Sequence, residues 1–355
     1  MAEQQLDFFR YLIPKDKEDY SSVYEFLTSL PIFYYGNNNP DVIELDREFI
    51  YQKNHYKVNV KKTRLSKNDD TFMGVIEQDV LDTLLYMATQ EKTQRIIENG
   101  RIKILVSVNE IYNQLKRKVR YENIKKAIQR LKETQISIQP LDPQKSNIKW
   151  HTESIISQYL IEDERYTAGK DPKTFIEFNT AFTKELLSGK IKLINFPKYI
   201  QLKNPISKYI YKKLVLSDMF SSSNYDLFYH NKSLFTFLLN CGYQTDTTTN
   251  KNNTIRAYKQ ALKELEEKDL LDLNKCKMEA IKQGNKVIDY FIELTPSRWL
   301  VDENHKQNKI KRFRKNNDED LTLLATPDEI SNYPPYKSDR DYYKDRQNRR
   351  HKMKF

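Results

Sequence analysis

Two stretches of this sequence, residues 120–139 and 254–273, place cations and amides three or four residues apart. Lys and Arg donate hydrogen bonds to guanine O6 and N7, while Asn and Gln pair with the N6 and N7 of adenine. Such side chains on one face of a helix have the chemistry to read base edges in the major groove. The candidates are Asn123, Lys125, Lys126, Gln129 and Arg130 in the first stretch, and Arg256, Lys259, Gln260 and Lys263 in the second.

Further cations flank these stretches, where they would meet phosphates rather than bases. Those around the start of the first stretch are Lys116, Arg117, Lys118 and Arg120, and those of two predicted hairpins are Lys145, Lys149, Lys282 and Lys286. An ordinary solvated helix face and solubilising lysines at hairpin tips explain the same residues. For the two helices, recurrence of the pattern in one sequence favours contact with DNA; for the hairpin lysines both interpretations stay open.

The sequence offers little for catalysis. A phosphate-binding loop needs a glycine five residues before its Gly-Lys pair, but Lys184 stands there before Gly189, and Glu164 before Gly169. The five histidines form no His-x-His or His-x3-His pair, so the metal-binding half of a DNA-nicking site is missing. A tyrosine nucleophile is not excluded, since there are 24 tyrosines. We expect no catalytic residues, no metal and no cofactor.

The elements that position the candidate readers follow from the apolar spacing. Ile124, Ile128 and Leu131 recur at helical intervals, and Ile136 and Ile138 then alternate as in a strand. The second stretch repeats this pattern 134 residues later, with its apolar positions at Tyr258, Ala261, Leu262, Leu265 and Leu270. The sequence therefore predicts an internal repeat of a helix that leads directly into a strand.

The surroundings of the two copies match as well. A short helical pattern precedes each copy, at residues 107–120 and 232–243, and a hairpin pattern follows each. In the second hairpin, Gly284-Asn285 separates two strand-forming runs, as in a tight two-residue turn. Helix, turn, helix and hairpin together are typical of the winged helix-turn-helix, whose second helix lies in the DNA major groove.

The remaining patterns extend this scheme. Residues 72–91 predict the first helix of the first unit, and residues 101–107 the strand before its helix pair. Tyr20, Tyr24 and Leu27 suggest a short helix, residues 42–62 a hairpin, and residues 64–70 a polar loop. In the middle of the chain, strands are predicted at 153–162 and 174–179 and a helix at 180–189, and Asn204-Pro205 predicts the start of the next helix.

We expect an α+β protein with two winged-helix domains in tandem. The predicted domains are an N-terminal extension with the first winged helix (1–150), a linking segment (151–203), the second winged helix (204–301) and a largely disordered basic tail (302–355). In the last of these, residues 305–355 hold 14 Lys and Arg against 8 Asp and Glu. That surplus is more than half of the net charge of +11, and positive charge of this kind attracts polyanions. The codon bias of an AT-rich genome explains the abundance of Lys, Asn, Ile and Tyr equally well.

Composition places the chain among soluble proteins. Hydrophobic residues make up 38% and charged residues 31%. No apolar run approaches the roughly 18 residues of a membrane helix, and the first residues lack the pattern of a signal peptide. Cys241 and Cys276 are too few for a disulfide framework or a four-cysteine zinc site. These features predict a cytoplasmic protein with no membrane partner.

Four segments carry a resemblance to a known family. They are SLPIFYY (29–35), GVIEQDVLDTLLYM (74–87), YENIKKAIQRLKETQISI (121–138) and KYIQLKNPISKYIYKKL (198–214). With the second recognition helix they span about 25–300, and the segment at 121–138 is the most specific. On these residues the chain resembles the plasmid replication initiators of tandem winged-helix type, and most closely the group called replication initiator protein A.

The resemblance implies binding to repeated sites in double-stranded DNA at a plasmid origin, opening of AT-rich DNA, and recruitment of a host helicase or its loader. It also implies a monomer–dimer equilibrium in which the homodimer represses the protein's own promoter. Three other functions stay open from the residues: a winged-helix transcriptional regulator without a role in replication, a nicking-type or primase-like initiator enzyme, and a host protein that uses winged helices for contacts with other proteins. We expect the protein not to be an enzyme.

Overall fold

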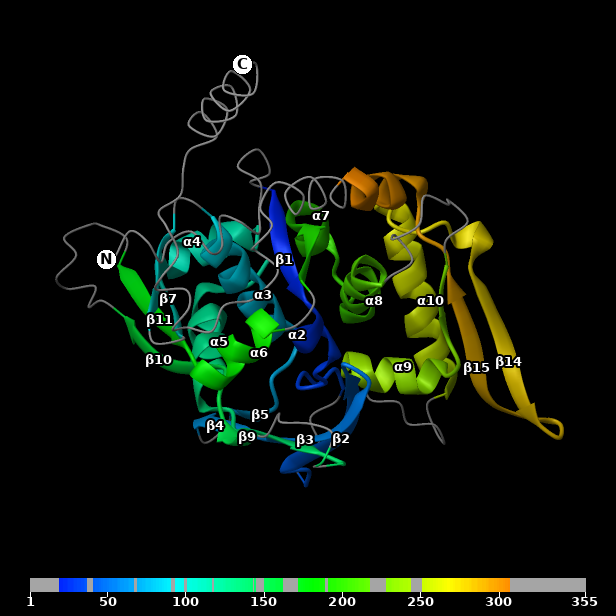
Figure 1. The fold of residues 1–355 in the computed structure, drawn as a ribbon, viewed down its shortest axis with the longest axis horizontal. Coiled ribbons are helices and arrows are strands. Elements are labelled where there is room, and N and C mark those ends of the chain that lie inside the picture. Colours follow the sequence, from blue (N-terminus) through cyan, green and yellow to red (C-terminus); the bar gives the residue numbers. More distant parts are fainter. Residues whose placement is uncertain are drawn as a thin grey trace, which may run out of the picture.

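The structure is a computed structural model in which two helical units lie side by side, each flanked by β-sheets (Figure 1). It describes residues 19–36, 41–66, 69–90, 93–98, 101–116, 118–142, 144, 150–161, 172–188, 191–217, 228–243 and 251–306. The predicted basic tail lies outside these residues, except that residues 298–306 form a helix. No described helix is both long and apolar enough to span a membrane.

The first unit contains three helices whose apolar stripes face one another. They are α3 (Val75–Thr89), α4 (Val108–Gln114) and α5 (Tyr121–Glu133). The start of α4 is fixed by a reciprocal cap, in which the Glu110 backbone N–H donates to the Ser107 hydroxyl and the Ser107 N–H donates to the Glu110 carboxylate. The predicted stripe of α5, including Ile124, Ile128 and Leu131, is fully buried.

The second unit repeats this arrangement with another three helices. They are α8 (Pro205–Leu216), α9 (Leu234–Cys241) and α10 (Lys251–Glu267). The Asn204 side chain accepts a hydrogen bond from the Ile206 N–H, so α8 starts where the sequence predicted. Helix α9 ends at Gly242, which caps the C-terminus in the left-handed conformation with φ +97°.

A three-stranded sheet completes the second unit. It consists of β13 (Tyr229–Asn231), β14 (Lys277–Gln283) and β15 (Lys286–Leu294), in the order β13-β15-β14. The short 3-10 helix η3 (Leu273–Lys275) directly precedes β14. Gln283 pairs with Lys286 across Gly284-Asn285, which confirms the predicted tight hairpin. The strand before the helix pair thus joins the hairpin after it in one sheet.

The first unit departs from this scheme because its strands are divided between two sheets. One sheet has the order β10-β11-β7-β6 and the other β2-β3-β8-β9. The first contains β6 (Gln94–Glu98), β7 (Arg101–Ser107), β10 (Ile156–Ile161) and β11 (Lys173–Phe178); the second contains β2 (Glu44–Tyr51), β3 (Asn54–Lys61), β8 (Ile136–Pro140) and β9 (Trp150–Glu153). The predicted hairpin at 42–62 is confirmed as β2–β3, and β3 pairs with β8.

A narrow ribbon and three short helices accompany the two units. They are β1 (Tyr20–Tyr24), α2 (Glu25–Ser29), α6 (Thr180–Ser188), β12 (Ile191–Asn195) and α7 (Phe196–Gln201). The prediction of a helix from Tyr20 to Leu27 was wrong at its start, because residues 20–24 form a strand that pairs antiparallel with β12. Four of its five residues are buried, so the apolar spacing reflected burial on both faces of a strand.

A second correction concerns residues 64–70, which the sequence predicted to be a loop. They contribute to a small hairpin of β4 (Thr63–Ser66) and β5 (Asp69–Thr71). Strand β4 packs against α5. The hairpin gave no alternating apolar signal, because it contacts the helix through polar groups: Asp69 pairs with Lys126 and Arg130, and the buried Thr63 hydroxyl bonds that of Thr134.

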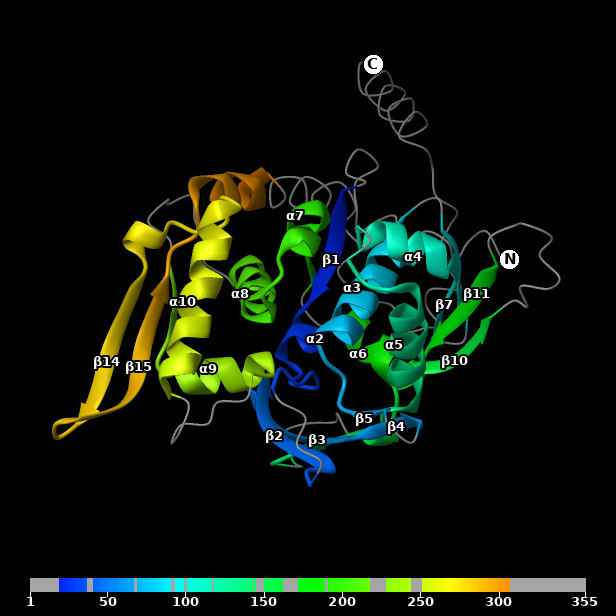
Figure 2. The same cartoon turned by 180° about the vertical axis from the view of Figure 1, so that it is seen from behind.

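The hydrophobic core is continuous across both units. Buried residues of α3, such as Leu84, and of α8, such as Ile210, belong to one cluster with the ribbon between them. Figure 2 shows α3, α8 and β1 together at the centre of the molecule. The structure is a mixed α/β fold in which a helix, then two strands in the first unit or one in the second, then two helices and a pair of antiparallel strands follow one another twice.

Candidate nucleic-acid interface

The outer face of α10 is exposed along its length. Tyr258, Ala261 and Leu265 face the core, which leaves the polar positions between them on the surface. All four reader residues predicted here are exposed, and none has a side-chain hydrogen bond or ion pair within the described part of the chain: Arg256, Lys259, Gln260 and Lys263. The structure brings them together on one helical face.

The electrostatics of this face are positive over most of its length. From Lys251 to Lys263 the helix has no acidic residue. The next residue, Glu264, is turned away, because its carboxylate accepts hydrogen bonds from the backbone N–H groups of Lys203 (2.6 Å) and Asn204 (3.1 Å). Glu266 and Glu267 are exposed at the C-terminal end of the helix. A polyanion would therefore meet no acidic residue of α10 itself along the N-terminal three-quarters of the helix.

The β14–β15 hairpin extends beside α10 and projects beyond the body of the molecule (Figure 1). Its tip lies near the start of α10, since the Lys251 ammonium donates to the backbone carbonyl of Val287. Lys282 and Lys286 are exposed at this tip. Their ammonium groups thus lie at the same end of the unit as the start of the α10 face.

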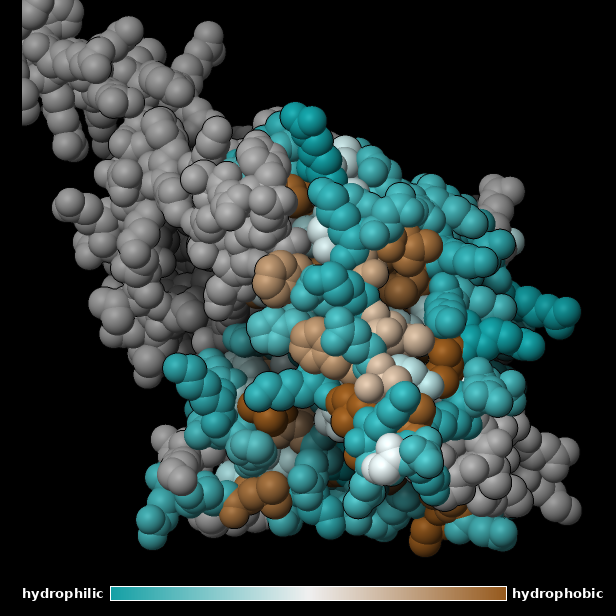
Figure 3. Space-filling model, turned by 90° about the vertical axis from the view of Figure 1, so that its right-hand side faces the viewer, coloured by the Kyte–Doolittle hydropathy of each residue, from teal (hydrophilic) through white to brown (hydrophobic). Residues whose placement is uncertain are grey.

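The surface on this side of the molecule is mostly hydrophilic. Figure 3 views it from the side of the hairpin and shows separate hydrophobic patches within a polar surface. Ile288 on β15 is 45% exposed, and Phe228 before β13 is 51% exposed. Scattered apolar side chains of this kind are normal on soluble proteins.

The polar face of α5 differs, because the hairpin β4–β5 and α3 supply it with carboxylates. The Arg130 guanidinium bonds Asp69 and lies 2.6 Å from the Glu77 carboxylate, and only 12% of its side chain is exposed. The Lys126 ammonium lies 3.0 Å from Asp69, although 52% of that side chain remains exposed. Two of the predicted readers are thus paired within the protein.

Other polar residues of α5 also have local partners. Gln129 donates to Glu133 one turn later at 2.8 Å, and the Lys125 ammonium lies 5.1 Å from the ring centroid of Tyr121. Asn123, near the start of the helix, lines a pocket. The two repeated helices therefore share a fold position but not an electrostatic environment.

The cations before α5 lie at the turn between α4 and α5. Lys116 is exposed with a left-handed backbone (φ +51°). Lys118 donates from its ammonium to the Ile200 carbonyl at 2.7 Å, and Arg120 is an exposed residue at the N-cap of α5. Arg117, Lys145 and Lys149 lie outside the described residues, so their predicted roles stay predictions.

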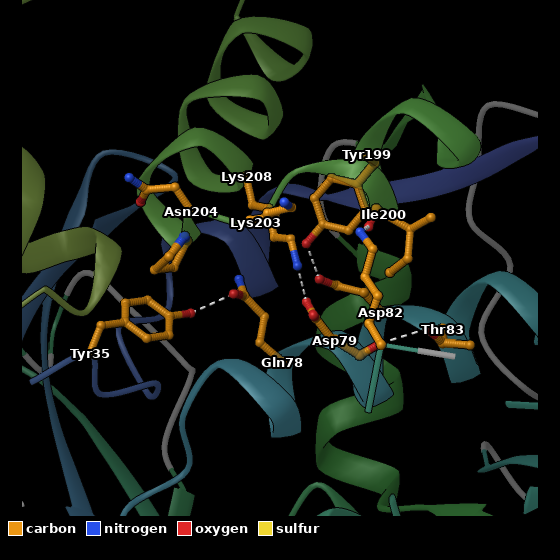
Figure 4. Close-up of polar contacts among 12 residues, drawn as sticks. Tyr35, Gln78, Asp79, Asp82, Thr83, Tyr199, Ile200, Lys203, Asn204 and Lys208 are labelled. Carbon is orange, nitrogen blue, oxygen red and sulfur yellow. Dashed lines mark hydrogen bonds and ion pairs between the residues drawn. The ribbon is translucent and has the colours of Figure 1, made fainter. Parts of the chain in front are cut away.

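We did not predict the charged cluster that lies between the two units. Asp79 on α3 bonds Lys208 on α8, and the Tyr199 hydroxyl donates to Asp82 (Figure 4). Asp82 also bonds Lys212 on α8. Lys212 lies 2.7 Å from both oxygens of Asp82, and Lys208 is only 1% exposed. Burial raises the pKa of Asp79 above its usual value, opposed by the adjacent Lys208 ammonium. The matching spacings, three residues on α3 and four on α8, were the available signal.

The cysteines are spread through the second unit. Cys241 is buried, and burial raises the pKa of its thiol well above the usual range. Cys276 is half-buried, with its pKa raised by burial to about 11. Among the residues that the structure describes, no three His, Cys, Asp or Glu side chains gather as a metal site would require.

Comparison with known proteins gives distant structural likenesses. No family model matches the sequence, and no curated protein matches it. The chain is similar to the crystal structure of RctB domains 2–3, at 13% identity and a TM-score of 0.44, over 76% of this chain and 96% of that one. It is also similar to the Pi initiator protein in complex with iteron DNA, at 13% identity and a TM-score of 0.43, over 63% and 91%. These likenesses are too distant to assign a function.

Proposed function

We propose that this protein binds double-stranded DNA through the second unit, with α10 in the major groove. The polar face of α10, whose predicted readers have no side-chain partner among the described residues, is the observation that carries the proposal. A major groove about 12 Å wide admits an α-helix, and this face presents three cations and an amide with no acidic residue among them. The hairpin β14–β15 then serves as the wing, with Lys282 and Lys286 on the phosphate backbone. In this proposal both units are winged helices.

The first unit contributes differently. Because Lys126 and Arg130 are neutralised by Asp69 and Glu77, α5 offers fewer free donors to base edges than α10 does. The exposed Lys116 and Arg120 lie in the turn before α5, near the N-terminal end of that helix. We assign to the first unit mainly backbone contacts, which position a protein on DNA, and to α10 the base contacts that specify a site.

The biological role proposed for this binding is initiation of plasmid replication. Its support is the sequence resemblance of residues 29–35, 74–87, 121–138 and 198–214 to plasmid initiators. On this proposal the protein binds repeated sites at an origin, promotes opening of the DNA, and recruits a host helicase or its loader, with a homodimer acting at its own promoter. It acts by binding and not by catalysis.

Two measurements test this function. The first selects duplex sites from a random pool and measures affinity for the selected site at several salt concentrations. We expect a strong salt dependence: for each tenfold rise in salt concentration, the logarithm of the binding constant falls by about 0.9 per phosphate contact. Affinity that is independent of both salt and sequence would contradict DNA recognition.

The second measurement addresses replication. The gene and its flanking DNA are joined to a plasmid that cannot replicate by itself, with an Arg256→Ala/Lys263→Ala version as control. We expect the wild-type gene to sustain the plasmid and the double variant to lose it. Sequence-specific binding without plasmid maintenance would instead indicate a transcriptional regulator.

A further inference from the structure

A pocket of about 400 Å³ opens between the two units. Its walls come from the start of α3, the turn between α4 and α5, and the connection from α7 to α8. Both units therefore contribute to it, although the segments lie far apart in the sequence. The residues with charged or polar side chains in its wall are Asp79, Lys118, Arg120, Asn123, Lys203 and Lys208.

The charge in this wall is unbalanced. Asp79 is its one carboxylate, and the Lys208 ammonium bonds it (Figure 4). Three cations remain, of which Arg120 and Lys203 are exposed and have no side-chain partner within the described residues. Among the described residues, the third, Lys118, has a neutral acceptor and no carboxylate: it donates to the carbonyl of Ile200 at 2.7 Å.

The surroundings of Lys118 reflect this excess. Burial lowers the pKa of its ammonium, and the nearby Lys208 ammonium lowers it further, as do Lys116 and Lys203, while Asp79 opposes them. Cations that repel one another around an open pocket are stabilised by an anion between them. Guanidinium and ammonium groups converging from different segments match the oxygens of a phosphate group, as Arg and Lys do in other phosphate sites.

The rest of the wall is apolar, formed by Val75, Ile76, Val119 and Leu202. A volume of about 400 Å³ exceeds what a phosphate group alone fills, and it falls within the size range of small-ligand sites. The apolar side chains thus leave room for the group that carries the phosphate.

We propose that this pocket binds a phosphate ester, with Arg120 and Lys203 on its oxygens and one contact from each unit. Two sources share this chemistry: a free nucleotide, whose sugar and base would lie against the apolar wall, and a backbone phosphate of DNA that crosses from one unit to the other. The site does not depend on base reading by α10.

The test uses the full chain and removes the two free cations. Arg120→Ser/Lys203→Ser is compared with the charge-retaining Arg120→Lys/Lys203→Arg, and with Lys61→Ala/Lys184→Ala, which removes the same charge from two exposed lysines elsewhere. Unchanged circular dichroism and melting temperature establish that the variants fold. Calorimetric titrations use AMP, ATP and inorganic phosphate, and a separate titration uses a short DNA duplex at low salt.

We expect the serine pair to weaken binding about tenfold or more, because two charge-assisted hydrogen bonds are lost, and the other two pairs to retain it. If AMP or ATP shows this loss, the source is a nucleotide; if only the duplex shows it, the source is the DNA backbone. The proposal is overturned if no probe depends on Arg120 and Lys203 more than on the control pair. If the Arg256→Ala/Lys263→Ala variant no longer binds the duplex but still binds AMP, the pocket is independent of α10. If the wild-type protein does not bind the duplex, the nucleotide titrations alone test the proposal.

Discussion

Arg130 and Arg256 occupy corresponding helices, yet their surroundings predict opposite behaviour. Arg130 is nearly buried between Asp69 and Glu77, whereas Arg256 projects from α10 with no partner among the described residues. A side chain's capacity to bind DNA therefore depends on whether the protein already neutralises it.

We therefore expect substitution of Arg256 to weaken DNA binding and substitution of Arg130 to lower stability. Arg256→Ala weakens binding to the selected duplex by about 1–3 kcal/mol and leaves the free energy of unfolding within about 0.5 kcal/mol of wild type. Arg130→Ala leaves Glu77 buried without its cation and lowers the free energy of unfolding by about 3 kcal/mol. Urea denaturation and fluorescence anisotropy with labelled duplex measure the two effects. A loss of affinity confined to Arg130→Ala would reverse our assignment of the helices.

Among the elements, the hairpin β4–β5 has a specific electrostatic effect on α5. Asp69 pairs with both Lys126 and Arg130, and its carboxylate lies beside the helix face that would otherwise attract phosphates. The hairpin thus masks the first of the two repeated helices.

Removal of that carboxylate tests the masking. Asp69→Asn keeps the shape of the side chain, leaves Glu77 to hold Arg130, and frees Lys126. We expect duplex binding to become tighter by a factor of about two to five, the size expected for one surface charge pair, with a steeper salt dependence. Asp46→Asn on β2 serves as the control, because it removes the same charge beside Lys57. Equal effects of the two variants would show only a change in net charge.

The end of α9 tolerates no side chain at Gly242. A Cβ atom at Gly242 would lie 2.3 Å from the carbonyl oxygen of Phe33, and its φ of +97° disfavours other residues. Residues 33–35 pack closely against the end of α9 here: the Tyr35 N–H donates to the Gly242 carbonyl at 2.9 Å, and the Arg47 guanidinium donates to the carbonyls of Phe33 and Gly242.

We expect Gly242→Ala to destabilise the protein strongly. Gly284→Ala is its matched control: φ is also positive, at +61°, but no atom lies within 4 Å of the added Cβ. The control costs only the conformational strain of about 1–2 kcal/mol, and the Gly242 variant costs this plus the backbone clash. Chemical denaturation measures both, and equal losses would show that the segment moves aside freely.

At the scale of the whole molecule, the two units are held together by a continuous core and by buried ion pairs. Asp82 and Lys212 are about 10% and 9% exposed at the contact between α3 and α8. Removing one partner of such a pair lowers the free energy of unfolding more than replacing both partners with apolar residues, because it leaves a buried charge uncompensated.

Asp82→Ala should therefore lower the free energy of unfolding by about 3–5 kcal/mol, and the double variant Asp82→Leu/Lys212→Met should recover most of that loss. Both are measured by urea denaturation at pH 7. Failure of the double variant to recover would indicate that Asp82 acts mainly through its other partner, Tyr199.

Local patterns predicted much of this molecule. The apolar spacing of α5 and α10 and the Gly284-Asn285 turn were sufficient to place two helix–hairpin repeats, because these signals lie within about twenty residues. The readers on α10 were placed by the same spacing, and they remain predictions until DNA is bound.

Contacts between distant segments were not predictable in this way. Tyr20–Tyr24 resembled a helix because its strand partner, β12, lies far along the chain. The pairing of Arg130 with Asp69 depends on where the polar residues 64–70 fold, and the pocket depends on how two units meet. Both are properties of tertiary arrangement and carry no local periodicity.

The most direct test of the account is a site-specific crosslink from α10 to DNA. A photoreactive amino acid replaces Gln260 on the exposed face of α10, and in a second protein Gln129 on α5. We predict that the Gln260 variant crosslinks to bases within the selected duplex and that the Gln129 variant crosslinks far less. Efficient crosslinking from position 129 with none from position 260 would contradict the proposal that α10 lies in the groove.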